Sequence, residues 1–371
     1  LNSAHSRDNV YDVGIGFDDD GRILAVTSSF VVDSGAYTPV GAGIAGNSIA
    51  HMLGPYDIPN YEADCKVVLT NRTPNAPYRG AGRPEAAFVT ERLIDLVAAE
   101  LGIEAAEMRR CNMVRPDQMP YDVGLPYRDG VAMVYDGGDY PGALDRALEA
   151  LGGLSEFRQR QQAARREGRW LGLGIASYTE GTGVGPFEGA TVRIGPSGRI
   201  TLSSGAAPQG QGHVTTMAQI CAEKFGVGIE DIKVELADTE KIANGVGTFA
   251  SRIAANAGPS VHLAAIEVRD KALRIAAHML EAAEQDLEIA DGRVTVRGVK
   301  ELSVTLGEIA GAVAGTPGYA LPGGIAPGLE ATHYFAPAQS AYCNGTHVVE
   351  VEVDAETGGV TILRYVAAHD A

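Results

Sequence analysis

Two arginines enclose three small residues in the segment Tyr78-Arg79-Gly80-Ala81-Gly82-Arg83, which Pro84 and Glu85 follow. Proline fits the first position of a helix, and a glutamate in the first turn interacts favourably with the positive end of the helix dipole. The segment therefore predicts a loop that leads directly into a helix over residues 84–101. Backbone N–H groups at such a helix start, beside two guanidinium groups, favour an anion or an oxygen atom that gains negative charge.

A second loop of small and amide residues, Gln209-Gly210-Gln211-Gly212-His213, also runs into a predicted helix, over residues 214–225. The glycines allow the main chain to approach a ligand closely, and the glutamine amides offer donors and acceptors in one plane. His213 is the histidine best placed for function, because it lies in this loop at a helix start. An ordinary loop with a helix cap explains the same residue types, and for this loop alone that alternative is the stronger.

A third loop, Asn244–Arg252, precedes a long helix predicted from Pro259 to Glu284. The loop ends in Ala250, Ser251 and Arg252, and a hydroxyl beside a guanidinium suits a phosphate or pyrophosphate group. Each of the three loops precedes a helix and carries Arg or Gln side chains. This shared design predicts that the helix N-termini converge on one polyanionic or heteroatom-rich ligand.

Residues 41–46 (Gly-Ala-Gly-Ile-Ala-Gly) match the dinucleotide pattern G-x-G-x-x-G. The context disfavours a dinucleotide fold, because Pro39 interrupts the lead-in and residues 47–53 are too few for a crossover helix before Gly54. We predict a glycine-rich loop without an enclosing βαβ unit here. The sequence also lacks G-x-x-x-x-G-K-[ST], H-E-x-x-H and G-x-S-x-G, so P-loop, zinc-protease and serine-hydrolase chemistry have no usual signature.

The 371-residue chain carries 47 acidic and 30 basic side chains, which give a net charge of −17. This charge opposes binding to nucleic acid and to anionic membrane surfaces. The sequence has no run of about 18 apolar residues and no signal-peptide pattern at its start, so we expect a soluble, cytoplasmic protein. The four cysteines form no C-x-x-C pair, which disfavours zinc and iron–sulfur sites, and we predict no metal-ligating residues.

Alternating strand and helix patterns predict an α+β fold with mixed sheets. Within residues 10–40, an Asp18-Asp19-Asp20-Gly21 turn joins two strand-like runs as a hairpin. Further strands are predicted at 65–69, 171–178, 190–194, 200–203, 232–236, 347–353 and 360–366, and further helices at 104–112 and 144–166. The chain length and the Pro, Gly and Asp-rich stretch 116–138 predict two domains, residues 1–140 and 141–371.

The segment 70–86, with Tyr78-Arg79-Gly80-Ala81-Gly82-Arg83 at its centre, resembles the active-site loop of molybdenum hydroxylase large subunits. This family contains xanthine dehydrogenases, aldehyde oxidoreductases and aerobic carbon monoxide dehydrogenases. The loop at 209–213 is similar to the family's glutamine loop that contacts the molybdopterin, and residues 248–252 are similar to the loop that holds its phosphates. Other segments, such as Gly54-Pro55-Tyr56, follow in the family order, so the resemblance spans nearly the whole chain.

The resemblance implies a molybdenum–molybdopterin cofactor, with the cytosine dinucleotide as one candidate form, and implies that Arg79 stabilises oxygen charge on the substrate. Electrons would leave through separate iron–sulfur and FAD subunits, in a multi-subunit parent that forms a homodimer of heterotrimers. Residues 1–140 would be the C-terminal part of the first molybdopterin-binding domain, and residues 141–371 the N-terminal and central part of the second. The residues implied to bind the cofactor are Gly80, Ala81, Gly82, Arg83, Gln209, Gly210, Gln211, Gly212, His213, Ala250, Ser251 and Arg252.

Two motifs of the family are missing from this sequence. The general-base glutamate lies in a G-x-G-E motif, and neither that motif nor the family's G-G-x-F-G occurs here. The chain is therefore expected to be an internal portion of a large subunit, incomplete at both ends and inactive alone. We call Tyr78–Arg83 the arginine loop. Copper-bearing members of the family place a cysteine in this loop, where this chain has Gly80-Ala81-Gly82, so no copper is expected.

The resemblance thus favours hydroxylation of an aldehyde or an N-heterocycle with water as the oxygen source. A non-catalytic assembly or scaffold subunit, which keeps the fold without the cofactor, is an alternative that the missing glutamate supports. A protein that uses the same loops to bind another phosphate ligand is a further alternative.

Overall fold

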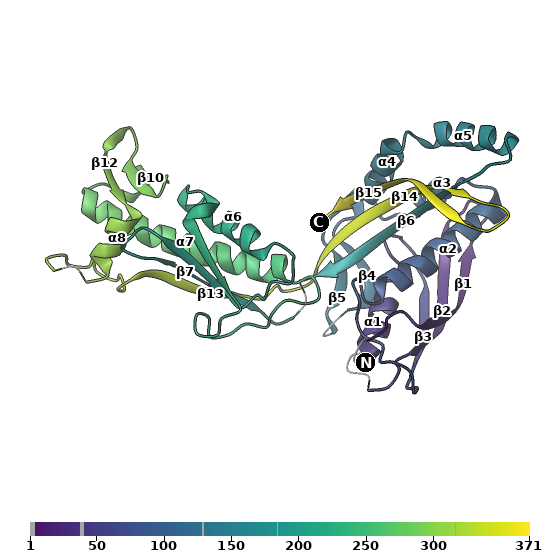
Figure 1. Cartoon of the computed structure of the whole chain (residues 1–371), viewed down its shortest axis with the longest axis horizontal. Coiled ribbons are helices and arrows are strands. Elements are labelled where there is room, and N and C mark those ends of the chain that lie inside the picture. The colour runs from purple at the N-terminus through teal and green to yellow at the C-terminus, as the bar shows by residue number, and fades with distance from the viewer. Residues whose placement is uncertain (1–3, 38–40, 128–129, 184, 316) are drawn as a thin grey trace. The chain divides into compact units, whose positions relative to one another are not determined.

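The chain folds into two compact units in the computed structural model, which describes residues 4–37, 41–127, 130–183, 185–315 and 317–371 (Figure 1). Unit 1 comprises Leu1–Gly181 and Ala341–Ala371, and unit 2 comprises Thr182–Ser340. The predicted division at 140/141 differs from these limits, because the last two strands of the chain return to a sheet of unit 1. The assignment of two molybdopterin-binding domains to residues 1–140 and 141–371 stays a prediction.

The N-terminal sheet of unit 1 has the strand order β1-β2-β3. β1 (Asn9–Phe17) and β2 (Ile23–Asp33) pair antiparallel. In the turn between them, Gly21 has a φ of 82° and donates its N–H to the Asp18 carbonyl, so the predicted hairpin is confirmed. β3 (Tyr61–Val68) runs parallel to β2, and helix α1 (Gly41–His51) connects the two as a βαβ unit.

The glycine segment 41–46 lies inside α1, so the predicted loop and the predicted absence of a βαβ unit are both wrong. A dinucleotide site uses glycines in the turn between strand and helix, whereas these glycines are helical. Small residues let other chain segments approach α1 closely: a Cβ added at Gly82 would lie only 2.5 Å from the Ile44 carbonyl oxygen. The helix therefore serves as a platform for the arginine loop.

The other helices of unit 1 are α2 (Arg83–Leu101), α3 (Ala105–Arg110), α4 (Tyr140–Ala150) and α5 (Leu154–Arg166). The predicted helix over 144–166 is in fact two helices, because Gly152 and Gly153 adopt φ angles of 102° and 84° between α4 and α5. Such left-handed residues end a helix. Short 3₁₀ turns are described at η1 (Pro116–Gln118), η3 (Ile229–Asp231) and η4 (Glu284–Asp286).

A second sheet of unit 1 has the order β15-β14-β6, and Figure 1 shows the yellow β14 and β15 beside β6. Its strands are β6 (Trp170–Thr182), β14 (Ala341–Val353) and β15 (Val360–Asp370). The hairpin of β4 (Tyr121–Pro126) and β5 (Ala132–Tyr135) lies in the Pro, Gly and Asp-rich stretch 116–138, where no strand was predicted. Ala50 of α1, Ile94 of α2 and Val348 of β14 are buried in one cluster, so these elements share one core.

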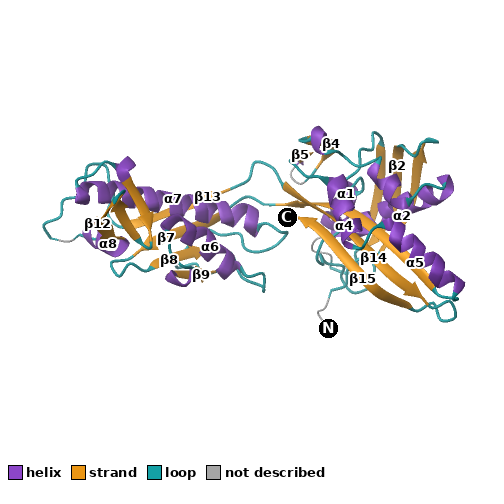
Figure 2. Ribbon diagram, turned by 90° about the horizontal axis from the view of Figure 1, so that it is seen from above, coloured by secondary structure: helices purple, strands orange, loops and turns teal. Residues whose placement is uncertain are grey.

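Unit 2 contains a mixed sheet of order β13-β7-β8-β9. Its strands are β7 (Glu188–Ile194), β8 (Ile200–Ser204), β9 (Ile232–Leu236) and β13 (Leu329–Phe335). Helices α6 (His213–Phe225) and α7 (Ile253–Leu280) pack on this sheet (Figure 2). Their inward faces are rich in alanine and form the core with the fully buried Phe225, Val261 and Ile275.

The long helix α7 begins at Ile253, and the predicted start at Pro259 is wrong because that proline lies inside the helix. The helix start therefore follows directly on the third loop, with Arg252 in the N-cap position. Five further elements in the described part of unit 2 were not predicted from the sequence. They are β10 (Leu287–Ala290), β11 (Arg293–Val296), β12 (Val299–Thr305), α8 (Leu306–Val313) and β13.

The predicted α+β class with mixed sheets is confirmed by this architecture. Within the described ranges, none of the helices combines the length and the apolar character that a bilayer-crossing segment requires.

Candidate functional site

The arginine loop of unit 1 has a left-handed backbone at three successive residues. Gly80, Ala81 and Gly82 have φ angles of 90°, 38° and 98°. A Cβ at Gly80 would lie 2.7 Å from the Pro84 ring, and a Cβ at Gly82 would meet the α1 backbone, so both glycines are required sterically. A left-handed alanine between them is strained, and such strain persists only where surrounding contacts hold it.

The contacts that hold this loop come from α1 and from the first turn of α2. The Asn47 side chain donates to the Ala81 carbonyl at 2.8 Å, and the Ser48 hydroxyl donates to the Gly82 carbonyl at 2.9 Å. The Gly82 N–H in turn donates to the Glu85 carboxylate at 3.1 Å. These bonds fix the orientation of successive peptide groups, so the loop presents a defined backbone surface.

The Arg83 side chain is buried and forms hydrogen bonds within unit 1. Its Nη1 donates to the Gly80 carbonyl and its Nη2 to the Gly181 carbonyl, both at 3.1 Å, and Nη2 also donates to the Tyr127 hydroxyl. Its Nε lies 3.6 Å from the Glu180 carboxylate. A guanidinium that is already shared among these acceptors orders the loop, so a ligand anion would meet the loop backbone rather than this side chain.

Arg79 is exposed, in contrast to Arg83. Its carbonyl accepts a 2.6 Å hydrogen bond from Arg7, and the Arg7 guanidinium lies 5.2 Å from the centre of the exposed Tyr78 ring. Among the described residues, no hydrogen bond or ion pair engages the Arg79 guanidinium. Of the two arginines in this loop, Arg79 is therefore the one whose side chain can act on a ligand.

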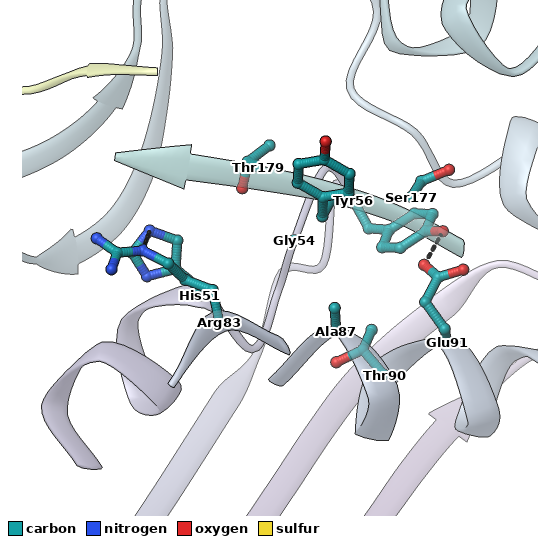
Figure 3. Close-up of a pocket in the computed structure, with 10 residues that line it drawn as sticks. His51, Gly54, Tyr56, Arg83, Ala87, Thr90, Glu91, Ser177 and Thr179 are labelled. Carbon is teal, nitrogen blue, oxygen red and sulfur yellow. Dashed lines mark hydrogen bonds between the residues drawn. The ribbon is translucent and has the colours of Figure 1, made fainter. Parts of the chain in front are cut away.

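A small cavity lies beside the buried Arg83, between α1, α2 and β6 (Figure 3). Its volume of about 10 Å³ admits one water molecule and no substrate. The Tyr56 hydroxyl donates to Glu91 at 2.6 Å on one side of it, and Glu91 pairs with Arg109 at 2.7 Å. Burial, with the Glu91 charge adding to it, raises the pKa of Tyr56 well above its ordinary value, so this phenol stays protonated. The cavity belongs to the interior that supports the loop.

The second and third loops lie together in unit 2. The Gln209 side chain donates to the Thr248 carbonyl at 3.3 Å, and the Gln211 side chain accepts from the Gln209 N–H at 2.7 Å. Gly210 and Gly212 have φ angles of 103° and 81°, and a Cβ at either position would meet no atom within 4 Å. Glycine is thus required here for backbone conformation, while the space in front of the loop is open.

The third loop contains two successive left-handed residues that are not glycine, Ala250 and Ser251, with φ angles of 50° and 52°. The Ser251 carbonyl accepts from the Gly183 N–H at 3.2 Å, and the Ser251 side chain is exposed. The strain places the serine immediately before the start of α7, where helical N–H groups lack intrahelical partners. An exposed hydroxyl beside such N–H groups suits a phosphate oxygen.

Arg252 holds the third loop in place through buried hydrogen bonds. Its side chain is fully buried and pairs with the equally buried Glu188, and it also donates to the Gly247 and Phe187 carbonyls. The Glu188 carboxylate accepts further bonds from the Val246 and Gly247 N–H groups at 2.9 and 2.7 Å. The guanidinium predicted to bind phosphate is therefore committed to the loop. Sequence reasoning missed Glu188, which lies on β7, 64 residues before its partner.

Several buried polar atoms around this loop pair have no hydrogen-bond partner among the described residues. They include Nδ1 of His213, Oγ1 of Thr248 and both amide atoms of Asn256. Buried polar atoms are almost always satisfied by protein, water or ligand. Together with the open space at Gly210 and Gly212, these atoms fit a ligand rich in donors and acceptors.

The predicted site residues are thus divided between the units. Residues 79–83 lie in unit 1, and residues 209–213 and 250–252 lie in unit 2. The structure brings the second and third loops together through Gln209 and Thr248. The convergence of the arginine loop with that pair stays a prediction. Among the described residues, no group of three or more His, Cys, Asp or Glu side chains is arranged to hold a metal ion.

Comparison with known proteins places both parts of the chain in one family. Family models described as molybdopterin cofactor-binding domains match residues 1–113 and 147–371. The chain is 35% identical to the 6-hydroxypseudooxynicotine dehydrogenase complex subunit gamma of Paenarthrobacter nicotinovorans, over 100% of this chain and 46% of that protein. It is also 35% identical to the carbon monoxide dehydrogenase large chain of Hydrogenophaga pseudoflava, over 99% of this chain and 47% of that protein.

Among solved structures, quinoline 2-oxidoreductase from Pseudomonas putida 86 is similar, with a TM-score of 0.86 and 34% identity over 99% of this chain and 48% of that one. The chain spans about half the length of the curated relatives it matches. The resemblance seen in the three loops is confirmed by these matches. The chain belongs to the molybdopterin cofactor-binding domain family of molybdenum hydroxylase large subunits.

Proposed function

We propose that this chain is the molybdopterin-binding portion of a molybdenum hydroxylase that hydroxylates an aldehyde or an N-heterocycle with oxygen from water. The observation that carries the proposal is the pairing of two glycine-containing loops at the starts of α6 and α7, through the 3.3 Å bond from Gln209 to Thr248. The similarity to quinoline 2-oxidoreductase supports the N-heterocycle as a substrate class.

The chain's own residues would hold the cofactor mainly with backbone and neutral side-chain groups. Gln209, Gln211 and His213 would meet the pterin, and Ser251, with the helix start behind it, would meet phosphate oxygens. Gly80–Gly82 would contribute backbone groups from unit 1. When bound, the cofactor supplies the oxidising centre at which oxygen from water enters the substrate. The protein itself would not need to donate a ligand to the molybdenum.

Arg83 and Arg252 would not contact the cofactor directly. Their guanidinium groups donate to carbonyls of their own loops and would hold the loop backbones in place. Arg79 would contact the substrate directly. Its exposed guanidinium would stabilise negative charge that develops on a substrate oxygen, a contribution that grows from ground state to transition state.

The remaining parts of the proposal concern the complete enzyme. We propose a cytosine dinucleotide form of the pterin, and no copper, because residues 79–83 offer no thiol to a soft metal. The names of the relatives, a complex subunit gamma and a large chain, support partner subunits, which we propose to carry iron–sulfur clusters and FAD. A homodimer of heterotrimers in the cytoplasm, with residues 1–140 and 141–371 in two molybdopterin-binding domains, completes the proposal.

The test is substitution of Arg79 in the complete enzyme, with quinoline and benzaldehyde as substrates. Arg79→Ala should lower kcat/KM by roughly 10²- to 10³-fold while the molybdenum content stays unchanged. The control is Arg115→Ala, because Arg115 is exposed and pairs only with the neighbouring Asp117 among the described residues. Absence of molybdenum from the parent enzyme would refute the proposed function, and retained kcat/KM in Arg79→Ala would refute the role of Arg79.

A further inference from the structure

His51, the last residue of α1, is buried against Arg83, with only 3% of its surface exposed (Figure 3). Its Nδ1 lies 3.0 Å from the Asn47 carbonyl oxygen, which can only accept. Its Nε2 lies 3.3 Å from the Gly181 N–H and 3.4 Å from Nε of Arg83, and both of these groups can only donate. The partners therefore assign the proton to Nδ1 and the lone pair to Nε2.

We infer that His51, as a neutral Nδ1–H imidazole, is a positioning residue that sets the arginine loop through Arg83. The consequence for catalysis rests on the proposed function. His51 itself does not lie in the loop, and nothing in the loop motif points to it. Its role follows from the hydrogen bond that its Nε2 accepts from Nε of Arg83, because this bond orients the Arg83 guanidinium.

The connection from His51 to the loop runs through opposite ends of one guanidinium. Nε of Arg83 faces the imidazole, while Nη1 donates to the carbonyl of Gly80, in the residue that directly follows Arg79. A planar guanidinium transmits orientation rigidly, because its donors keep fixed angles to one another. Rotation of Arg83 away from His51 would therefore move the Gly80 carbonyl and, with it, the backbone of Arg79.

The surroundings of His51 leave this arrangement little freedom. The Tyr127 ring meets the imidazole edge-on, with ring centres 5.1 Å apart, and lies 5.9 Å from the Arg83 guanidinium. A Cβ at Gly181 would lie 2.9 Å from that tyrosine ring, so the residue beside the imidazole must be small. Glu180 supplies the nearby negative charge for Arg83. A charged imidazolium would place an Nε2–H against two other donors, so these partners favour the neutral Nδ1–H tautomer.

Two amide substitutions at position 51 distinguish a positioning role of His51 from a general packing role. Glutamine at position 51 places an amide oxygen near the position of Nε2 and keeps an acceptor for Arg83 and Gly181. Asparagine is one methylene shorter, so it keeps a donor toward the Asn47 carbonyl and loses that acceptor. The two variants carry the same functional group and differ in which hydrogen bond they restore.

The experiment uses the complete enzyme with quinoline and measures kcat, KM, molybdenum content and hydrogen exchange of a peptide covering residues 78–88. His51→Asn should lower kcat roughly 10- to 100-fold with KM and molybdenum content nearly unchanged, and should speed exchange of the Ala81 and Arg83 amides. His51→Gln should stay within about threefold of the parent kcat and keep the parent exchange rates.

Equal behaviour of the two variants, in kcat and in exchange, would overturn the inference. A loss of molybdenum or of folded protein in His51→Asn that His51→Gln shares would overturn it as well. If the parent enzyme contains no molybdenum, the proposed function fails, and the exchange rates alone then decide whether His51 positions the loop.

Discussion

Replacement of Arg252 by methionine should destabilise unit 2, because it removes the group that closes the third loop. The guanidinium donates to the Glu188 carboxylate, to the Gly247 carbonyl at 2.7 Å and to the Phe187 carbonyl. Methionine keeps the apolar length of the side chain and donates no hydrogen bond. The buried carboxylate would then lose its charged partner and keep only the Val246 and Gly247 N–H donors, and the two carbonyl oxygens would lose the arginine as a donor, while the volume of the site changes little.

Removal of one partner from a buried ion pair costs about 3–5 kcal/mol, because the remaining charge stays in a medium of low polarity. Glu188 and Arg252 are both fully buried, so we expect a loss of about that size. Arg193 offers a matched control in the same unit. It pairs with Glu330 at 3.6 Å, but the two side chains are 69% and 53% exposed, so Arg193→Met should cost less than about 1 kcal/mol.

The free energies come from urea unfolding, and hydrogen exchange of residues 244–252 reports on the third loop itself. In a Glu188→Gln background no unpaired charge remains, so Arg252→Met should cost at least about 1 kcal/mol less than in the parent. An Arg252→Met cost no larger than that of Arg193→Met, or additive effects of the two substitutions at the buried pair, would refute the role of this ion pair. Faster exchange in the third loop should accompany the loss of stability.

Gly82→Ala should cost about 1–3 kcal/mol more in unfolding free energy than Gly102→Ala, because a Cβ at position 82 would lie 2.5 Å from the Ile44 carbonyl, whereas the left-handed Gly102 has open space. Burial raises the pKa of the Cys221 thiol to about 12, so iodoacetamide at pH 8 should alkylate it only after unfolding, and rapid labelling of the native chain would contradict its burial. Burial, and then the neighbouring His369, lowers the pKa of His347, so the unfolded chain binds this proton more readily. Stability should therefore fall as the pH drops below the ordinary histidine value of 6.5, and His347→Gln should flatten that part of the curve measured by urea unfolding.

The sequence predicted elements well where local signals fix them. Glycine, proline and glutamate placed the start of α2 within one residue, and the Asp-rich turn placed the first hairpin. The same signals failed at Pro259, because proline favours a first turn but α7 continues through it on the packing of Val261 and its neighbours. The short strands β10–β12 were missed because their pairing depends on partners rather than on a run of β-forming residues.

The candidate site shows the same limit for side chains. The sequence placed Arg83 and Arg252 among the ligand-binding residues, because an arginine beside glycines and a helix start is typical of anion sites. It could not show that Glu180 and Glu188, on β6 and at the start of β7, reach these arginines. A buried guanidinium must find its acceptors inside the protein, and each of these does so by binding carbonyls of its own loop.

Arg83 and Arg252, two of the three arginines in these loops, are therefore already engaged in hydrogen bonds that hold the loops. Under the proposed function, the phosphate and pterin groups of the cofactor would therefore be bound mainly by helix N–H groups, amides and the Ser251 hydroxyl. Arg79 alone among the three keeps an exposed guanidinium. Under the proposed function, this exposed side chain would stabilise the negative charge that develops on the substrate, so it would act on the transition state rather than in holding the cofactor.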